Sequence, residues 1–237
     1  MCGRMHLAMP FRDIAILMDI TGPAPNSEPD YNIGPTKKAL VVYLHPVTRD
    51  RISEPMRWGM IPRWAKAAYS PYTNHLARAE TVDQLATFRA PWREGKRCLI
   101  VTEGFYEWKK SKTNPKNKQP FAIAKANSPL TVVAGLWEQW RDPQNGEILK
   151  SCAMITVPAN SLIAPMNERM PVILRADQWA KWLGQEPAHE QELKDMLRPY
   201  PAEDMTLWPV SKRVGNVRNN DAELLTPVEI DLGEFGD

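Results

Sequence analysis

The second residue of the chain, Cys2, offers the most distinctive chemistry in the sequence. A cysteine is small enough for the initiator Met1 to be removed, and we expect the mature chain to begin at Cys2. That residue would then carry a free α-amine, with an ordinary pKa of about 8, beside a thiol, with an ordinary pKa of about 8.5. Such a pair reacts with an aldehyde in two steps, because the amine forms a Schiff base and the thiolate then closes a five-membered thiazolidine. The alternative is an ordinary N-terminal tail that happens to contain a cysteine.

A candidate acid–base group lies in the segment Gly104-Phe105-Tyr106-Glu107-Trp108-Lys109. Alternate residues of a strand share a face, so Glu107 would point with Phe105 while Tyr106 and Trp108 point the other way. A carboxylate held among large aromatic side chains suits general acid–base catalysis. The alternative is a glutamate that faces solvent on a half-exposed strand.

A second candidate lies in residues 73–80, which we expect to be extended. This backbone would put four side chains on one face, those of Asn74, Leu76, Arg78 and Glu80. Arg78 could then hold a phosphate through paired hydrogen bonds, or it could simply pair with Glu80.

Two more segments favour loops that a ligand could reach. The trio Asn167-Glu168-Arg169 stands between proline and methionine residues, which is a poor pattern for a core strand and favours a site loop. Residues 208–220 hold three cations, Lys212 among them, and several amide side chains. Such a run could line a nucleic-acid backbone, although it is also typical of a solvated loop.

The periodicity predicts the elements that must position these groups. We expect strands over residues 39–44, 54–59, 97–101, 104–109, 120–124, 131–140, 151–157 and 205–210. A tight turn at Glu103-Gly104 would join two of them, and residues 110–118 read as a basic hairpin loop. Helices are expected over residues 10–20, 82–88, 175–184 and 190–197. We expect a loose C-terminal tail over residues 227–237.

Length and composition indicate one globular domain. The chain has 237 residues, a net charge of +2 and an ordinary apolar content. We predict a single domain over residues 1–226, with an α+β fold whose core is a curved, mostly antiparallel, barrel-like sheet with peripheral helices. The small net charge excludes a polycation, so any nucleic-acid site must be a local patch.

The cysteines and histidines do not predict a metal site or a disulfide framework. The three cysteines, Cys2, Cys98 and Cys152, are odd in number and lack CxxC spacing, and the four histidines form no pair at metal-ligand spacing. We recognise no signal peptide and no membrane-spanning segment, which predicts a cytoplasmic location and no membrane partner.

Together these segments resemble the SOS response-associated peptidase (SRAP) family over roughly residues 1–226. The markers follow one another in chain order: Met1-Cys2-Gly3-Arg4, Tyr31-Asn32-Ile33-Gly34-Pro35, Arg57-Trp58-Gly59-Met60-Ile61-Pro62 with Trp64, Ala77-Arg78-Ala79-Glu80-Thr81, Gly104-Phe105-Tyr106-Glu107-Trp108-Lys109, Glu168-Arg169-Met170-Pro171, and Pro209-Val210-Ser211 through Val214-Gly215-Asn216-Val217. Each marker is short, but the ordered set is specific.

The resemblance implies a bacterial, nucleoid-associated repair protein that senses abasic sites in single-stranded DNA as a monomer, with no metal or organic cofactor. Cys2 would form a thiazolidine crosslink with the ring-opened sugar, and Glu107 would assist the proton transfers. Asn74 and Asn167 would orient the sugar. Strand cleavage of the lyase type and a self-cleavage that exposes the cysteine are also implied. DNA contacts are expected from Arg4, Asn32, Pro35, Trp64, Arg78, Arg169 and Lys212, with Trp64 and Pro35 stacking on unpaired bases.

Two positions depart from the family pattern. Family members usually carry asparagine where this chain has Leu76, and histidine where it has Asn167. Asn74 could replace the missing asparagine only if the backbone bulges. Because an asparagine does not titrate near neutral pH as a histidine does, we expect crosslinking to survive and crosslink reversal or strand cleavage to be slower.

Two other functions remain open on the sequence. The first is an N-terminal-nucleophile amidohydrolase or peptidase, in which the Cys2 thiol attacks an amide and its own amine is the base. The second is a non-catalytic paralogue that only binds single-stranded DNA.

Overall fold

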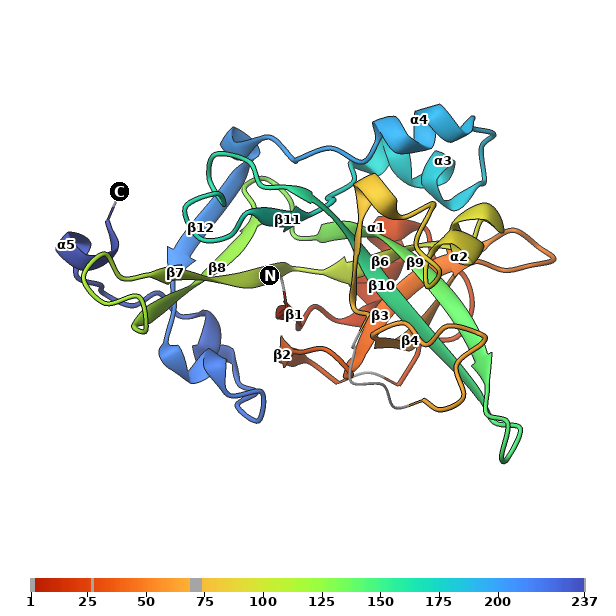
Figure 1. Ribbon diagram of the computed structural model, residues 1–237, viewed down its shortest axis with the longest axis horizontal. Coiled ribbons are helices and arrows are strands. Elements are labelled where there is room, and N and C mark those ends of the chain that lie inside the picture. Colours follow the sequence, from red (N-terminus) through yellow and green to blue (C-terminus); the bar gives the residue numbers. More distant parts are fainter. Residues whose placement is uncertain (1–2, 27, 69–73, 237) are drawn as a thin grey trace.

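The protein is built from two sheets surrounded by short helices, as Figure 1 shows. The computed structural model describes residues 3–26, 28–68 and 74–236. The first sheet has five antiparallel strands in the order β12, β8, β7, β1, β2. Their bounds are Met205–Pro209, Lys118–Lys125, Gly104–Lys110, Met5–Leu7 and Asp30–Ile33.

The central strand β7 is paired unequally on its two edges. Its register with β8 runs from Phe105 to Lys110, whereas its register with β1 covers only Gly104 and Phe105. One more backbone hydrogen bond, from Tyr106 N to Arg4 O at 2.9 Å, extends the contact with the N-terminal segment. Glu107 therefore lies just past the described pairing with that segment.

The second sheet closes on itself. A ring of pairings joins β3 to β4, β4 to β10, β10 to β9, β9 to β6 and β6 to β3. The bounds are Lys38–Leu44 for β3, Arg51–Trp58 for β4, Arg97–Thr102 for β6, Thr131–Arg141 for β9 and Ile148–Pro158 for β10. The pairing of β10 with β4 is parallel and the other four are antiparallel.

Two three-residue strands extend this ring along β10. The strand β5 (Leu76–Arg78) pairs in parallel with one edge of β10, and β11 (Arg169–Pro171) pairs antiparallel with the other edge. Thr156 is flanked by both, because its partners are Arg78 on β5 and Pro171 on β11. This architecture confirms the predicted α+β fold with a mostly antiparallel, barrel-like core.

Two strands of the ring, β3 and β6, read as nearly continuous apolar runs because both of their faces are covered. Residues 39–44 of β3 and 98–102 of β6 are all buried. Their apolar side chains belong to one large cluster that also includes Met5 of β1, Phe105 of β7 and Trp182 of a helix. Both sheets therefore contribute to this cluster, and a smaller one forms around Tyr106 of β7 and Val210.

The helices lie around the sheets, as predicted (Figure 1). They are α1 (Phe11–Met18), α2 (Arg89–Arg93), α3 (Trp179–Leu183), α4 (Glu190–Asp195) and α5 (Leu232–Phe235). The predicted helices near residues 10, 175 and 190 are confirmed, but the helix predicted over residues 82–88 is wrong, because that segment forms turns that lead into α2. Among the described residues, no helix has the length and apolar character to cross a membrane.

The two strands predicted on either side of the tight turn at Glu103-Gly104 both exist, but they do not pair with each other. The strand before it, β6, pairs with β3 and β9, whereas the strand after it, β7, pairs with β8 and β1. The chain therefore passes from one sheet to the other at this point. A side chain at Gly104 would not fit, because its Cβ would lie 2.5 Å from Ile123 O. Glycine permits the close approach.

The C-terminal segment also differs from the loose tail that the sequence predicted. In its described part, residues 227–236, Val228 N donates to Pro209 O at the end of β12, and Glu234 contacts the loop between β7 and β8. Phe235 is 5% exposed. Lys112 N donates to Glu234 O at 3.1 Å, and Asn117 Nδ2 donates to Glu234 Oε1 at 2.8 Å. The acidic segment is thus fastened to the basic loop.

Candidate active site

Glu107 and Asn167 meet where the two sheets approach each other. Glu107 lies on β7 and is 2% exposed. Asn167 lies in the loop between β10 and β11, and its Nδ2 donates to Glu107 Oε1 at 2.9 Å. Its Oδ1 accepts a hydrogen bond from Arg169 N at 3.3 Å, which fixes the direction of the amide. The loop predicted as a site loop therefore delivers a polar side chain to the predicted acid–base residue.

A cleft of about 440 Å³ opens at this pair. Its lining combines the two polar groups with an aromatic ring, a thioether, a second carboxylate and two ammonium groups, from Glu107, Trp108, Lys110, Lys118, Met166, Asn167 and Glu168. The lysines were not predicted as site residues. The sequence marked a basic hairpin loop, but only the pairing of β7 with β8 brings both lysines to the cleft.

The N-terminal segment approaches the same place. Met5 lies opposite Phe105 and His6 opposite Gly104. If this antiparallel register continues, Gly3 lies beside Glu107. Cys2, the predicted nucleophile, lies outside the described residues, one position before Gly3.

The two other cysteines are poor nucleophiles. Cys98 and Cys152 are free and fully buried in the core. Burial raises the pKa of both thiols, which leaves them protonated and unreactive at neutral pH. Among the described residues, no group of histidine, cysteine and acidic side chains could hold a metal ion.

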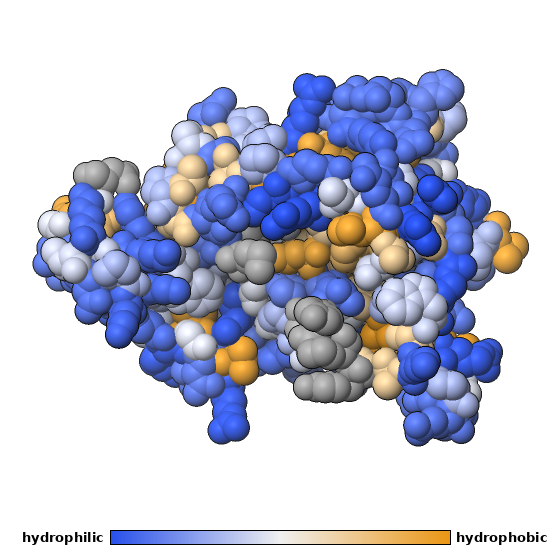
Figure 2. All heavy atoms as spheres, in the orientation of Figure 1, coloured by the Kyte–Doolittle hydropathy of each residue, from blue (hydrophilic) through white to orange (hydrophobic). Residues whose placement is uncertain are grey.

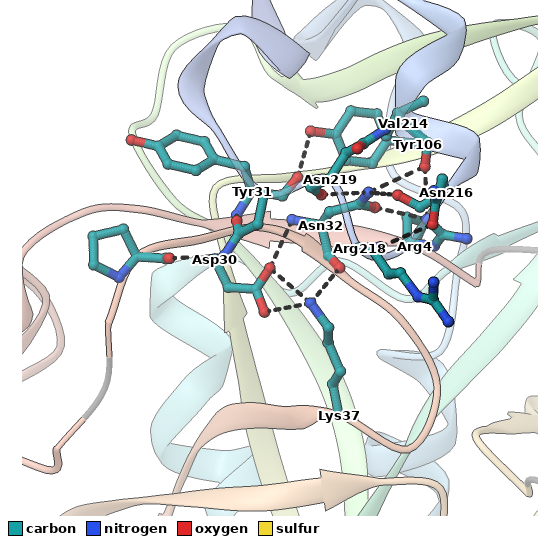
Figure 3. A network of polar contacts seen from close by, with 12 residues as sticks. Arg4, Asp30, Tyr31, Asn32, Lys37, Tyr106, Val214, Asn216, Arg218 and Asn219 are labelled. Carbon is teal, nitrogen blue, oxygen red and sulfur yellow. Dashed lines mark hydrogen bonds and ion pairs between the residues drawn. The ribbon is translucent and has the colours of Figure 1, made fainter.

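A buried network fixes the N-terminal segment, as Figure 3 shows. Arg4 Nη1 donates to Asn32 Oδ1 and to Val214 O, each at 2.7 Å. Asn32 Nδ2 lies 3.1 Å from Val214 O, 3.0 Å from Asn216 O and 3.0 Å from Asn219 O. Asn32 is fully buried, which does not favour direct contact with DNA. In this structure Asn32 connects β1 and β2 to the loop that follows β12.

Two of the predicted phosphate-binding arginines differ in their surroundings. Arg169 donates to both carboxylate oxygens of Glu80, at 2.6 and 2.8 Å, and to Thr156 O at 2.6 Å. The hydrogen bond from Arg169 lowers the pKa of the Glu80 carboxyl. Arg78 is exposed at the end of β5 and makes no ion pair with any described residue. Arg78 is therefore the more available cation.

Asn74 does not line the cleft of Glu107. It lines a smaller cleft of about 170 Å³ together with Arg57 and Trp64. The extended segment predicted over residues 73–80 is limited to β5, because Asn74 has a left-handed backbone with φ 45° and Glu80 lies in a 3₁₀ turn. Asn74 Nδ2 donates to Met60 O at 3.4 Å, which turns it toward the loop of Trp64.

The remaining predicted contacts lie on the surface. Trp64 is 63% exposed, so its ring is free to stack on a base. Pro35 is half-buried in the turn between β2 and β3. Lys212 is exposed, and its Nζ donates to Asn117 Oδ1 at 2.7 Å in the loop between β7 and β8. The structure does not gather these three residues with Glu107 in one cleft.

Comparisons with known proteins show the family and agree with the fold. The family model described as SOS response associated peptidase (SRAP) matches residues 1–217. Abasic site processing protein YoqW of Bacillus subtilis (strain 168) is 37% identical over 227 residues, which cover 95% of this chain and 99% of that protein. Abasic site processing protein HMCES of Pongo abelii is 31% identical over 237 residues, which cover 85% of this chain and 66% of that protein. A crystal structure of a protein from Bacteroides thetaiotaomicron has the same fold, with a TM-score of 0.84 at 21% identity over 96% of this chain and 100% of that one.

Proposed function

Because this chain belongs to the SOS response associated peptidase (SRAP) family, we propose that it processes abasic sites in single-stranded DNA. YoqW and HMCES are named as abasic site processing proteins, and the match covers nearly all of YoqW. The observation that carries the proposal is the buried Glu107, hydrogen-bonded to Asn167 at a polar cleft next to the N-terminal strand.

The proposed reaction uses Cys2 after Met1 has been removed. The α-amine attacks the aldehyde carbon of the ring-opened sugar and forms a carbinolamine. Loss of water gives the Schiff base, and the thiol then adds across its carbon–nitrogen double bond, with its proton passing to the nitrogen. The product is a thiazolidine, formed from one amine, one thiol and one aldehyde with release of one water. No oxidant, metal or cofactor takes part in this sequence of bonds.

Glu107 would move the protons that these steps require. The carbinolamine oxygen must gain a proton to leave as water, and the attacking amine must lose one. A carboxylate that is shielded from solvent and held by Asn167 is placed to do both. Asn167 itself would hold Glu107 and the sugar in position without exchanging a proton.

The DNA strand would also contact exposed groups outside the cleft of Glu107. Arg78 is the available phosphate-binding arginine, and Trp64 offers a face for base stacking. Arg169 would have a different role from Arg78. Its pairing with Glu80 would hold β11 and the loop of Asn167 in position.

A denaturing gel tests the proposal. We expect the protein, incubated with single-stranded DNA that carries one abasic site, to form a heat-stable adduct that Cys2→Ala does not form. Cys2→Ser is the matched control, because it keeps the α-amine and loses the sulfur; it should give only an adduct that requires borohydride reduction to survive. Intact mass of the purified protein reports whether Met1 has been removed. An adduct of unchanged yield from Cys2→Ala would contradict the proposal.

A further inference from the structure

The hairpin of β7 and β8 carries two like charges in direct opposition. Lys110 and Lys118 form the last cross-strand pair of this hairpin, and both are exposed. Like charges that face each other across a strand pair destabilise it. Neither lysine makes an ion pair with any described residue. Their mutual repulsion is therefore not relieved by an ion pair within the described part of the chain.

The two lysines line the same cleft as Glu107 and Asn167. Among the described residues of that lining, the other charged group is Glu168, which is exposed in the loop between β10 and β11. The lining thus combines the buried carboxylate of Glu107 with two exposed lysines. This arrangement suits a ligand that is anionic at one end and has its reactive group some distance away.

The hairpin that holds the lysines is fixed at its tip. Ser111 Oγ accepts hydrogen bonds from Thr113 N at 3.2 Å and from Asn114 N at 3.0 Å, which closes the turn. The C-terminal segment adds the bond from Asn117 Nδ2 to Glu234. Figure 1 shows the hairpin and α5 together at one end of the molecule, and Figure 2 shows mostly hydrophilic residues there. The lysine pair is therefore presented by an ordered element.

We propose that Lys110 and Lys118 together bind one backbone phosphate of the DNA strand that enters the cleft. The inference rests on the proposed function and adds a phosphate site that the sequence motifs did not include. The Cβ atoms of two directly opposed residues in a strand pair lie about 5 Å apart. The ammonium groups of Lys110 and Lys118 can therefore both reach one phosphate, and the anion removes the repulsion between them.

The position of the pair separates it from the reacting sugar. Lys110 is three residues beyond Glu107 on β7, which corresponds to about 10 Å between their backbone positions along the strand. In this proposal the bound phosphate therefore belongs to a neighbouring nucleotide and not to the sugar that reacts. The lysines are therefore positioning residues, which act on DNA binding and leave the chemical step unchanged.

Salt dependence of binding to intact single-stranded DNA tests the inference without relying on the crosslink. We expect the double variant Lys110→Gln/Lys118→Gln to bind more weakly at low salt, with the slope of log K against log [salt] reduced by about 0.7 for the one lost phosphate contact. Lys116→Gln is the matched control, because it removes one charge from the tip of the same hairpin and does not line the cleft. Lys110→Arg/Lys118→Arg should restore most of the slope.

Crosslinking rates complete the test. With abasic DNA, we expect the double glutamine variant to need a higher DNA concentration for half-maximal rate and to reach the wild-type maximum. The inference is overturned if its salt slope equals that of the wild type, or if Lys116→Gln reduces the slope equally. A wild-type protein that forms no adduct would refute the proposed function instead, and the binding slopes would still decide the role of the lysines.

Discussion

Glu107 receives a hydrogen bond from the amide of Asn167, at a position where the resemblance to the family led us to expect an imidazole. The bond from Asn167 Nδ2 at 2.9 Å holds the carboxylate, and the amide cannot accept the proton that the carboxylate gives up. A proton that leaves Glu107 therefore does not pass to Asn167. This difference affects forward and reverse steps unequally if reversal requires a second acid–base group.

The role of Glu107 predicts the effect of Glu107→Gln. We expect crosslinking to slow by roughly 10²- to 10⁴-fold, because a glutamine keeps the size and the acceptor oxygen for Asn167 but cannot transfer a proton. Gel time courses under single-turnover conditions measure the rate. DNA binding and the urea midpoint should stay near wild type, and a crosslinking rate within a factor of two of wild type would exclude Glu107 as the acid–base group.

Position 167 predicts a gain of function. We expect Asn167→His to release crosslinked DNA faster than wild type, with a release rate that depends on pH around the ordinary imidazole pKa of about 6.5. Asn167→Gln is the control, because it retains an amide. Release is followed after transfer of the preformed adduct into an excess of unlabelled abasic DNA. If the histidine variant releases DNA no faster than wild type, the amide is not what limits reversal.

At the residue level, the sequence identified candidate site residues better than it predicted the partners that these residues have in the structure. Glu107 and Asn167 were both singled out, and the structure brings them together. Asn32 and Arg169 were predicted as DNA contacts, but the first is buried in a network and the second is paired with Glu80. Their partners come from distant segments, Val214 and Glu80, and a motif carries no information about which of its polar groups is satisfied inside the protein.

At the level of elements, the network of Asn32 fastens the N-terminal strand. It joins β1 and β2 to the loop after β12 through Arg4 and three backbone carbonyls. Gly34 allows this packing, since a Cβ there would lie 3.3 Å from Val217 and 3.5 Å from Arg4. The segment that leads toward the cleft is thus held from two sides.

Asn32→Ala should therefore weaken both stability and activity. Removing the amide leaves several buried carbonyls and the Arg4 guanidinium with fewer partners, and we expect the free energy of unfolding to fall by about 3 kcal/mol. Urea titration measures this loss. Asn26→Ala, at an exposed position, should change it by less than about 0.5 kcal/mol. Crosslinking by Asn32→Ala should also slow, and an unchanged stability would show that the network is not a support for the strand.

The apolar patterning of the sequence predicted where the strands lie, but it did not predict which strands pair with each other. Each expected strand exists, because alternation and apolar runs are local signals. The tight turn at Glu103-Gly104 was predicted from the glycine between two strands, but the sequence does not show that these strands belong to separate sheets. The C-terminal segment was read as loose because its charges were visible and the burial of Phe235 was not.

At the scale of the whole molecule, the cleft depends on how the closed ring and the five-stranded sheet are joined. Glu107 belongs to the sheet, and Asn167 belongs to a loop of the ring. His6 of β1 lies opposite Gly104, where the chain passes from the ring to the five-stranded sheet. It is 3% exposed, its ring is 5.4 Å from that of Tyr106, and neither ring nitrogen has a hydrogen-bond partner among the described residues.

The burial of His6 predicts a loss of global stability in mild acid. Burial lowers the pKa of His6 to about 4, whereas in the unfolded chain it is about 6.5. As the pH falls below about 6.5 the unfolded state gains a proton that the folded state does not take up until about pH 4. The free energy of unfolding should therefore drop by about 2 kcal/mol between pH 7 and pH 5 through this residue.

Urea titrations at both pH values measure this loss. It should disappear in His6→Leu and remain in His45→Leu, which changes a histidine on a partly exposed turn. Should the leucine variant fail to fold, the ring proton shifts of wild-type His6 serve instead: a titration midpoint near pH 6.5 in the folded protein would contradict the prediction.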